Sequence, residues 1–215
     1  MNRIKVAGVL GVLALGIGVA LAQAPANMSF FVTSKNPGKG GDLGGLAGAD
    51  AYCQSLAAKV GAGNKTWHAY LSTSTVNAKD RIGKGPWYNV KGVMIAKDLS
   101  DLIGAKANHI NAETALTEEG KAPNYLGGNP PAPLQEPLQH DMLTGTDDNG
   151  MATDMTCNNW TSSSDDAKAT LGHADRLGRA EGVNSWTTAH PSQGCSMEKL
   201  KPTGGAGLFY CFAVN

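Results

Sequence analysis

Three histidines in the second half of the chain stand beside or close to other polar residues. His140 precedes Asp141, His173 lies two residues before Asp175, and His190 follows further along the chain. Imidazoles bind transition metals and exchange protons near neutral pH, so these side chains could converge on a metal or a polar site. No two of them are spaced i, i+4 on an expected helix, and histidines in loop-rich domains often bind loop carbonyls instead. His140, His173, Asp175 and His190 are therefore ligand-binding candidates, with a structural role as the alternative.

A second group of oxygen donors follows the first of these histidines. Asp147, Asp148 and Asn149 are consecutive, and Asp154 comes shortly after them. Calcium takes about six to eight oxygen ligands with anionic character, which this composition resembles. An EF-hand register fails, however, because its first and last ligand positions would be glycine and threonine. The sequence leaves these four residues as a candidate calcium site, and a solvated Asp-Asn-Gly turn is the alternative.

Tryptophans provide the other indication of binding. An exposed indole can stack on a sugar ring while its N–H donates to a hydroxyl. Trp67, Trp87 and Trp160 stand in strand-like patterns that predict burial in the core. Trp186 lies in the loop-rich region, shortly before Cys195, and is the candidate for stacking on a ligand.

Several functional signatures are absent from the sequence. The chain contains neither the G-x-S-x-G of a nucleophile elbow nor the H-E-x-x-H of a zinc protease. Residues 61–66 (GAGNKT) only approach a phosphate-binding loop, because asparagine stands at the lysine position. The 18 Lys and Arg residues balance 18 Asp and Glu residues, so the basic excess of a general nucleic-acid binder is missing.

The first 24 residues have the pattern of a secretory signal peptide. Arg3 and Lys5 precede an apolar run, and Ala22-Gln23-Ala24 is a small-x-small cleavage motif. A retained membrane anchor is disfavoured, because the run is interrupted by glycines and is marginal in length. We expect cleavage after Ala24, a secreted or periplasmic location, and a mature chain without a membrane span. In such a compartment four cysteines are expected to form disulfides, and they allow three pairings.

Hydrophobic periodicity predicts the elements that must position these side chains. Residues 29–33 and 66–72 have the pattern of strands, whereas residues 46–60 place Cys53 and other apolar side chains on one helical face. Between Gly120 and His140, five prolines exclude regular structure. A second apolar run lies at residues 93–96, one or two helical turns are expected at 97–103, and strands are expected at 155–162, 185–190 and 207–214. This order predicts an α+β fold in a single domain, residues 25–215, with one main N-terminal helix and a loop-rich second half.

The placement of the four cysteines carries a family resemblance. Cys53 lies on the first expected helix, Cys211 lies in an aromatic last strand (FYCF, 209–212), and Cys157 and Cys195 form an inner pair around long loops. The runs involved are GGLAGADAYC (44–53), TWHAYLST (66–73), DRIGKGPWYN (80–89), HDMLTGTDDNG (140–150), TCNNWTS (156–162), LGHADR (171–176) and GGAGLFYCF (204–212). They resemble the C-type lectin-like fold, and within it a group of exported bacterial proteins described as lectin-like or endostatin-like domains. The resemblance covers nearly all of the mature chain. It implies small antiparallel sheets and disulfides joining Cys53 to Cys211 and Cys157 to Cys195.

The sequence departs from the sugar-binding members of that fold. Those members resemble one another in an E-P-N or Q-P-D tripeptide and a W-N-D motif, which surround a calcium ion that contacts sugar hydroxyls. Here neither tripeptide occurs, and Thr187 and Thr188 follow Trp186 where Asn and Asp would stand. Two threonines do not supply the anionic oxygens that calcium needs. The one cofactor that the sequence suggests is therefore calcium, bound in the Asp147 region.

Three functions follow as hypotheses. The first is a non-catalytic binding module that recognises a glycan or protein ligand through residues 140–194. The second is a structural subunit that self-assembles into an extracellular or cell-surface polymer. The third is a metal-dependent enzyme using His140, His173 and His190. Oxidases of this fold use a copper-binding cysteine pair, and the expected use of all four cysteines as bridges argues against that class.

Overall fold

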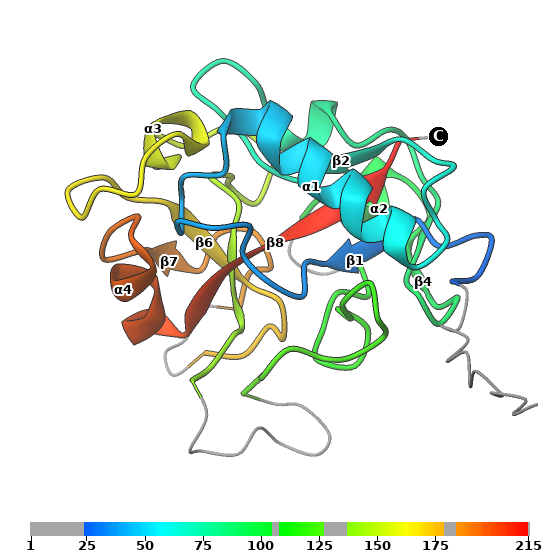
Figure 1. Cartoon of the computed structure of the whole chain (residues 1–215). Helices are drawn as coiled ribbons and strands as arrows, with labels where there is room; N and C mark the ends of the chain where they lie inside the picture. Colours follow the sequence, from blue (N-terminus) through cyan, green and yellow to red (C-terminus); the bar gives the residue numbers. More distant parts are fainter. Residues whose placement is uncertain (1–23, 105–107, 127–136, 179–183, 215) are drawn as a thin grey trace, which may run out of the picture.

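The longest strand, β8 (Gly205–Ala213), runs through the middle of the structure (Figure 1). Its side chains alternate between two core clusters, with Phe209 and Cys211 in one and Leu208 and Tyr210 in the other. This is the period-two pattern of a strand. Eight of its nine residues are buried, so the strand carries core on both faces. The expected C-terminal strand is confirmed.

Five further strands complete the main sheet around β8. The computed structural model describes residues 24–104, 108–126, 137–178 and 184–214. In these residues the sheet order is β1-β8-β5-β6-β7, and β2 also pairs with β8. The added strands are β1 (Phe30–Val32), β2 (Trp67–Ala69), β5 (Asp141–Leu143), β6 (Thr170–His173) and β7 (His190–Pro191). A separate two-stranded sheet contains β3 (Trp87–Tyr88) and β4 (Met94–Ala96).

The direction of one strand pair corrects an expectation. β5 pairs with β8 in parallel, whereas all other pairs in the main sheet are antiparallel. The main sheet is therefore mixed, not purely antiparallel. A parallel pair needs a long crossover, and here the chain between β5 and β8 provides β6, β7 and the second disulfide loop.

Helix α1 (Gly45–Lys59) covers one face of this sheet (Figure 1). Ala49, Cys53, Leu56 and Ala57 are buried on it and pack against β2 and β8, so the helical face expected from the sequence is confirmed. The helix ends where Val60 and Gly61 donate back to the last-turn carbonyls. It is the one helix longer than a single turn in the part of the chain that the structure describes.

The other helical elements are single turns, and one of them is left-handed. They are η1 (Ala78–Asp80), α2 (Leu99–Leu102), α3 (Cys157–Trp160), α4 (Met197–Leu200) and η2 (Lys201–Thr203). All four residues of α3 have positive φ. Two of them are asparagines, which tolerate this conformation better than most residues. The extended segment expected at residues 155–162 is therefore wrong. The segment expected at 185–190 is also wrong, except at His190, because only that residue pairs in the sheet.

Two disulfides join Cys53 to Cys211 and Cys157 to Cys195, the pairing that the resemblance implied. The first ties α1 to β8, and the second closes the loops around α3 and β6. Both are compatible with an extracellular or periplasmic location. The signal-peptide pattern and most of the proline-rich loop lie outside the described residues. No helix within the described ranges is long and apolar enough to cross a membrane.

Candidate functional site

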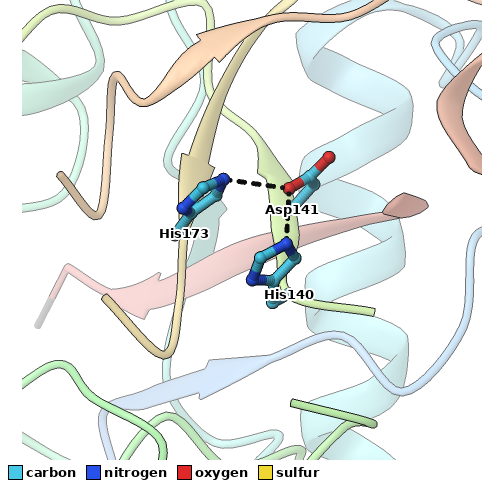
Figure 2. Close-up of side chains that lie close together, drawn as sticks. All are labelled: His140, Asp141 and His173. Carbon is cyan, nitrogen blue, oxygen red and sulfur yellow. Dashed lines mark ion pairs between the residues drawn. The ribbon is translucent and has the colours of Figure 1, made fainter. Parts of the chain in front are cut away.

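Strand pairing brings the candidate histidines together at one end of the main sheet. Asp141, the first residue of β5, pairs directly with His173, the last residue of β6. His190 opens β7, where it pairs with Leu171 and so lies diagonally beside His173 on the same face. His140 comes directly before β5. Figure 2 shows one oxygen of the Asp141 carboxylate paired with a ring nitrogen of His140 and with one of His173.

The three imidazoles point their Nε2 atoms at one carboxylate oxygen. The distance to Oδ1 of Asp141 is 3.3 Å from Nε2 of His140, 3.3 Å from Nε2 of His173 and 3.5 Å from Nε2 of His190. The Nε2 atoms of His173 and His190 are 3.0 Å apart. The rings of His140 and His173 stack with their centroids 4.2 Å apart. Four potential ligand atoms thus surround one small volume.

The Asp141 carboxylate is fully buried and lacks hydrogen bonds. Its side chain has 0% exposure, and neither of its oxygens accepts a hydrogen bond from the described part of the chain. The side chains of His140 and His173 are 6% and 4% exposed, against 26% for His190. A buried carboxylate without hydrogen bonds is costly.

Charges in the cluster shift several pKa values. Burial alone would raise the pKa of Asp141, but the imidazoles around it hold that pKa below its usual value. Burial alone would lower the pKa of His140, yet the hydrogen bond to Asp175 and the charge of Asp141 raise it. The Asp141 carboxylate also raises the pKa of His190, against the effect of partial burial. The carboxylate thus favours positive charge on the rings of His140 and His190.

A second carboxylate orients His140 from behind. Nδ1 of His140 lies 3.2 Å from Oδ1 of Asp175, which leaves Nε2 facing the centre. Asp175 is itself fixed, because its oxygens accept hydrogen bonds from the backbone N–H groups of Leu126 and Leu177. Burial alone would raise the pKa of Asp175, but its hydrogen bond to His140 lowers it. A carboxylate bound to the distal nitrogen is the usual support of a metal-binding histidine.

Four of the six separations among these donor atoms match those expected around a tetrahedral metal ion. Four ligands at roughly 2.0 to 2.1 Å from a zinc ion lie about 3.3 Å from one another. The four measured separations run from 3.0 to 3.5 Å. One atom each of His140, Asp141 and His173 lies within 4.8 Å of the others, and no other group of this kind occurs among the described residues. His190 adds a fourth donor, close to two of the three.

Comparison of the sequence with protein-family models and with curated proteins finds no match.

A cavity of about 430 Å³ opens beside this centre. The rings of His140, His173 and His190 form part of its wall, together with Leu126, Leu138 and Lys201. Asp141 does not line it. The cavity therefore gives solutes access to the histidine side of the centre.

The structure brings together four of the five predicted ligand-binding residues. His140, His173, His190 and Asp175 belong to one cluster. Trp186 does not belong to an exposed surface, because it is 2% exposed and packs against Tyr70 and Tyr210. The expectation of an exposed indole at Trp186 is wrong, since the residue lies in the second core cluster. The predicted burial of Trp67, Trp87 and Trp160 is confirmed.

The candidate calcium residues form a turn. Oδ1 of Asp147 accepts hydrogen bonds from the backbone N–H groups of Asn149 and Met151, and Asp148 accepts one from the Ser185 hydroxyl. The carboxylates of Asp147, Asp148 and Asp154 do not gather into a group of ligand atoms. The geometry therefore favours the turn that was the alternative interpretation.

Sequence reasoning missed Asp141 as a ligand. Its position directly after His140 was visible, but two consecutive strand residues normally point to opposite faces. Here His140 precedes the strand, and its Nε2 turns back towards the Asp141 carboxylate. A histidine–aspartate pair at a strand start was the available signal.

We expect Gly204→Ala to weaken metal binding at this centre. A Cβ at Gly204 would lie 2.7 Å from Cδ2 and Nε2 of His140, so the ring must move. A displaced metal ligand costs about ten- to a hundredfold in affinity. Gly104→Ala is the matched control, because Gly104 also has positive φ but nothing within 4 Å of its Cβ position. Zinc titration calorimetry compares the two variants, and equal losses in both would show that Gly204 acts through backbone strain alone.

Proposed function

We propose that this protein is an exported binding module of the C-type lectin-like fold whose functional centre holds a divalent transition metal, zinc fitting best. The ligands are His140, Asp141 and His173, and His190 is the fourth donor. One observation carries the proposal: three imidazole nitrogens surround a buried carboxylate that accepts no hydrogen bond from the described residues. A metal ion would supply the positive charge that this carboxylate lacks.

The donor set favours zinc over calcium. Imidazole nitrogen suits zinc, copper, nickel and iron, whereas calcium takes oxygen donors almost exclusively. Three imidazoles and one carboxylate are a donor set that zinc accepts. The binding proposal therefore moves from the Asp147 turn, where the sequence suggested calcium, to the ends of β5, β6 and β7.

Two features support the proposed fold. The helix-to-terminal-strand bridge and the inner loop bridge have the pairing that the resemblance implied. The centre lies among the loops and strand ends of the second half, where the resemblance places ligand binding. With Trp186 in the core, recognition of a ligand is assigned to the metal centre and its cavity.

Metal analysis of the purified mature chain tests the proposal directly. After incubation with zinc and removal of free metal, we expect one zinc per chain by elemental analysis. Calcium, added in the same way, should neither be retained nor shift the melting temperature. Absence of bound zinc, copper, nickel, iron, manganese and cobalt after the same treatment would remove the proposal. A monomer with one zinc supports a binding module, whereas an ordered polymer would favour the assembly hypothesis.

We expect zinc affinity to rise steeply with pH. The raised pKa values of His140 and His190 mean that these rings hold protons which zinc must displace. Each imidazolium that loses its proton adds about a tenfold change in affinity per pH unit below its pKa. Calorimetry between pH 5.5 and pH 8 in buffers of different ionisation enthalpy measures both affinity and protons released. A constant affinity over this range would contradict the assignment.

The stability of the metal-free protein should show the opposite dependence on pH. A raised histidine pKa stabilises the fold below the unfolded value, roughly 6.5, and this contribution is lost as pH rises through the folded value. The lowered pKa values of Asp141 and Asp175 stabilise it above roughly 3.9, and this contribution is lost as pH falls through the folded values. The cluster therefore stabilises the metal-free fold most between about pH 4 and 6.5. The zinc-induced rise in melting temperature should be small at pH 5 and grow towards pH 8.

A further inference from the structure

The four donors of the proposed metal centre are unequally exposed. The side chains of Asp141, His173 and His140 are between 0% and 6% exposed, whereas His190 is 26% exposed. His190 also lines the cavity, and Asp141 does not. A solute that approaches a metal at this centre therefore meets it on the side of His190.

His190 is also held less firmly than His140. Nδ1 of His140 faces the Asp175 carboxylate, which is fixed by two backbone N–H groups. Among the described residues, the partner of Nδ1 of His190 is the carbonyl oxygen of the adjacent residue, Pro191, at 3.0 Å. β7 is a two-residue strand paired with β6 alone. Of the four donors, His190 is the one that another ligand can displace with least disturbance.

The cavity wall indicates the chemistry of that ligand. Lys201 is exposed at the wall, and none of the described lining residues is Asp or Glu. Leu126, Leu138 and Pro202 give the wall an apolar part. A divalent metal bound to the single carboxylate of Asp141 keeps one net positive charge. The site thus offers a metal, one ammonium and an apolar surface.

We propose that the centre binds a small carboxylate with an apolar body, which replaces His190 on the metal, pairs with Lys201 and packs against Leu126 and Leu138. This inference rests on the proposed metal site. The charges of the metal and of Lys201 would suit either a carboxylate or a phosphate, and the apolar wall at Leu126 and Leu138 favours a carboxylate with an apolar body. The apolar wall has no use in binding inorganic phosphate.

The first experiment uses the full mature chain loaded with cobalt(II), whose visible absorption reports its ligands. Benzoate, its neutral analogue benzamide, and inorganic phosphate are titrated separately. We expect a saturable spectral change with benzoate, none with benzamide, and at least tenfold weaker binding of phosphate. Phosphate binding as tight as benzoate, or no response to benzoate by a cobalt-loaded protein, would overturn the inference and leave the metal site standing. Absence of bound cobalt and zinc by elemental analysis would overturn both.

Two variants test the roles of the side chains. Lys201→Gln should retain the metal and weaken benzoate binding about fivefold, as expected for a partly exposed ion pair. Lys199→Gln, on the preceding turn and outside the cavity, should leave benzoate binding unchanged. If the two substitutions weaken benzoate binding equally, Lys201 acts only through its contribution to the overall positive charge, and the proposed ion pair with the carboxylate is wrong.

His190→Ala tests the exchange of ligands. If the carboxylate replaces His190, this variant keeps the metal with a loss below about tenfold and binds benzoate more tightly than the wild type. If His190→Ala loses metal binding as completely as Asp141→Asn does, His190 is a fixed ligand, and the proposed replacement of His190 by the carboxylate is wrong.

Discussion

The Asp141→Asn variant is expected to bind zinc at least about a hundredfold more weakly than the wild type, while its metal-free form keeps its stability. Asn has nearly the same shape as Asp, but its amide lacks the charge that attracts a cation. Removing the charge takes away the attraction of the imidazoles that lowers the pKa of Asp141, but it also removes the cost of burying a carboxylate that accepts no hydrogen bond within the described structure, so the two effects largely offset each other. We expect the free energy of unfolding to change by less than about 1 kcal/mol at pH 7.5.

The paired measurement separates a metal ligand from a structural residue. Zinc calorimetry gives the affinity, and urea denaturation in the presence of a chelator gives the metal-free stability. A structural Asp141 would show the reverse result, with a large loss of stability and unchanged zinc affinity. His173→Gln should reproduce the loss of zinc binding. His109→Gln is its control, because His109 is exposed and its Nδ1 lies at hydrogen-bonding distance from the carbonyl oxygen of Met94, outside the histidine cluster.

The sequence predicted those parts of the fold that local patterns specify. Apolar side chains of α1 recur at helical spacing, and the helix observed at Gly45–Lys59 agrees with the one expected at residues 46–60. The aromatic C-terminal run became β8. The disulfide pairing came from the family resemblance, because spacing alone allowed three pairings. These features depend on neighbours in sequence or on a known pattern.

Long-range pairing is the part that local patterns did not reveal. Nothing in residues 141–143 indicates that β5 lies parallel to β8. Residues 155–162 were expected to form a strand, yet all four residues from Cys157 to Trp160 adopt the left-handed conformation. Tertiary context decides both outcomes.

The candidate site was predicted in its members but not in its arrangement. His140, His173 and His190 belong to three adjacent strand ends, and only the register of β5, β6 and β7 brings their rings together. A search for i, i+4 pairs on helices could not detect them. Trp186 illustrates the opposite error, since a position between loops suggested exposure, whereas its indole fills the core beside Tyr70.

The largest effect on stability should come from removing the Cys53–Cys211 bridge. The bridge closes a chain segment with a sequence separation of 158, and the chain-entropy model gives a contribution of about 5 kcal/mol. The Cys157–Cys195 bridge, with a separation of 38, gives about 4 kcal/mol in the same model. The double variant Cys53→Ala with Cys211→Ala is therefore expected to be the less stable of the two double variants. Chemical denaturation under non-reducing conditions measures both, and the reverse order would indicate that packing around α3 outweighs loop closure.

Zinc should restore part of the stability that this variant loses. The centre is coupled to β8, because the backbone N–H of Asp141 donates to Gly204, and β5 pairs with β8 from Gly205 to Phe209. A ligand that binds only the folded state at a hundred times its dissociation constant stabilises it by roughly 2.7 kcal/mol. We expect this increment in the bridge variant as in the wild type, and none when Asp141→Asn is added. If zinc binds the bridge variant without raising its unfolding free energy, the ends of β5, β6 and β7 form the site independently of the strand that α1 is bridged to.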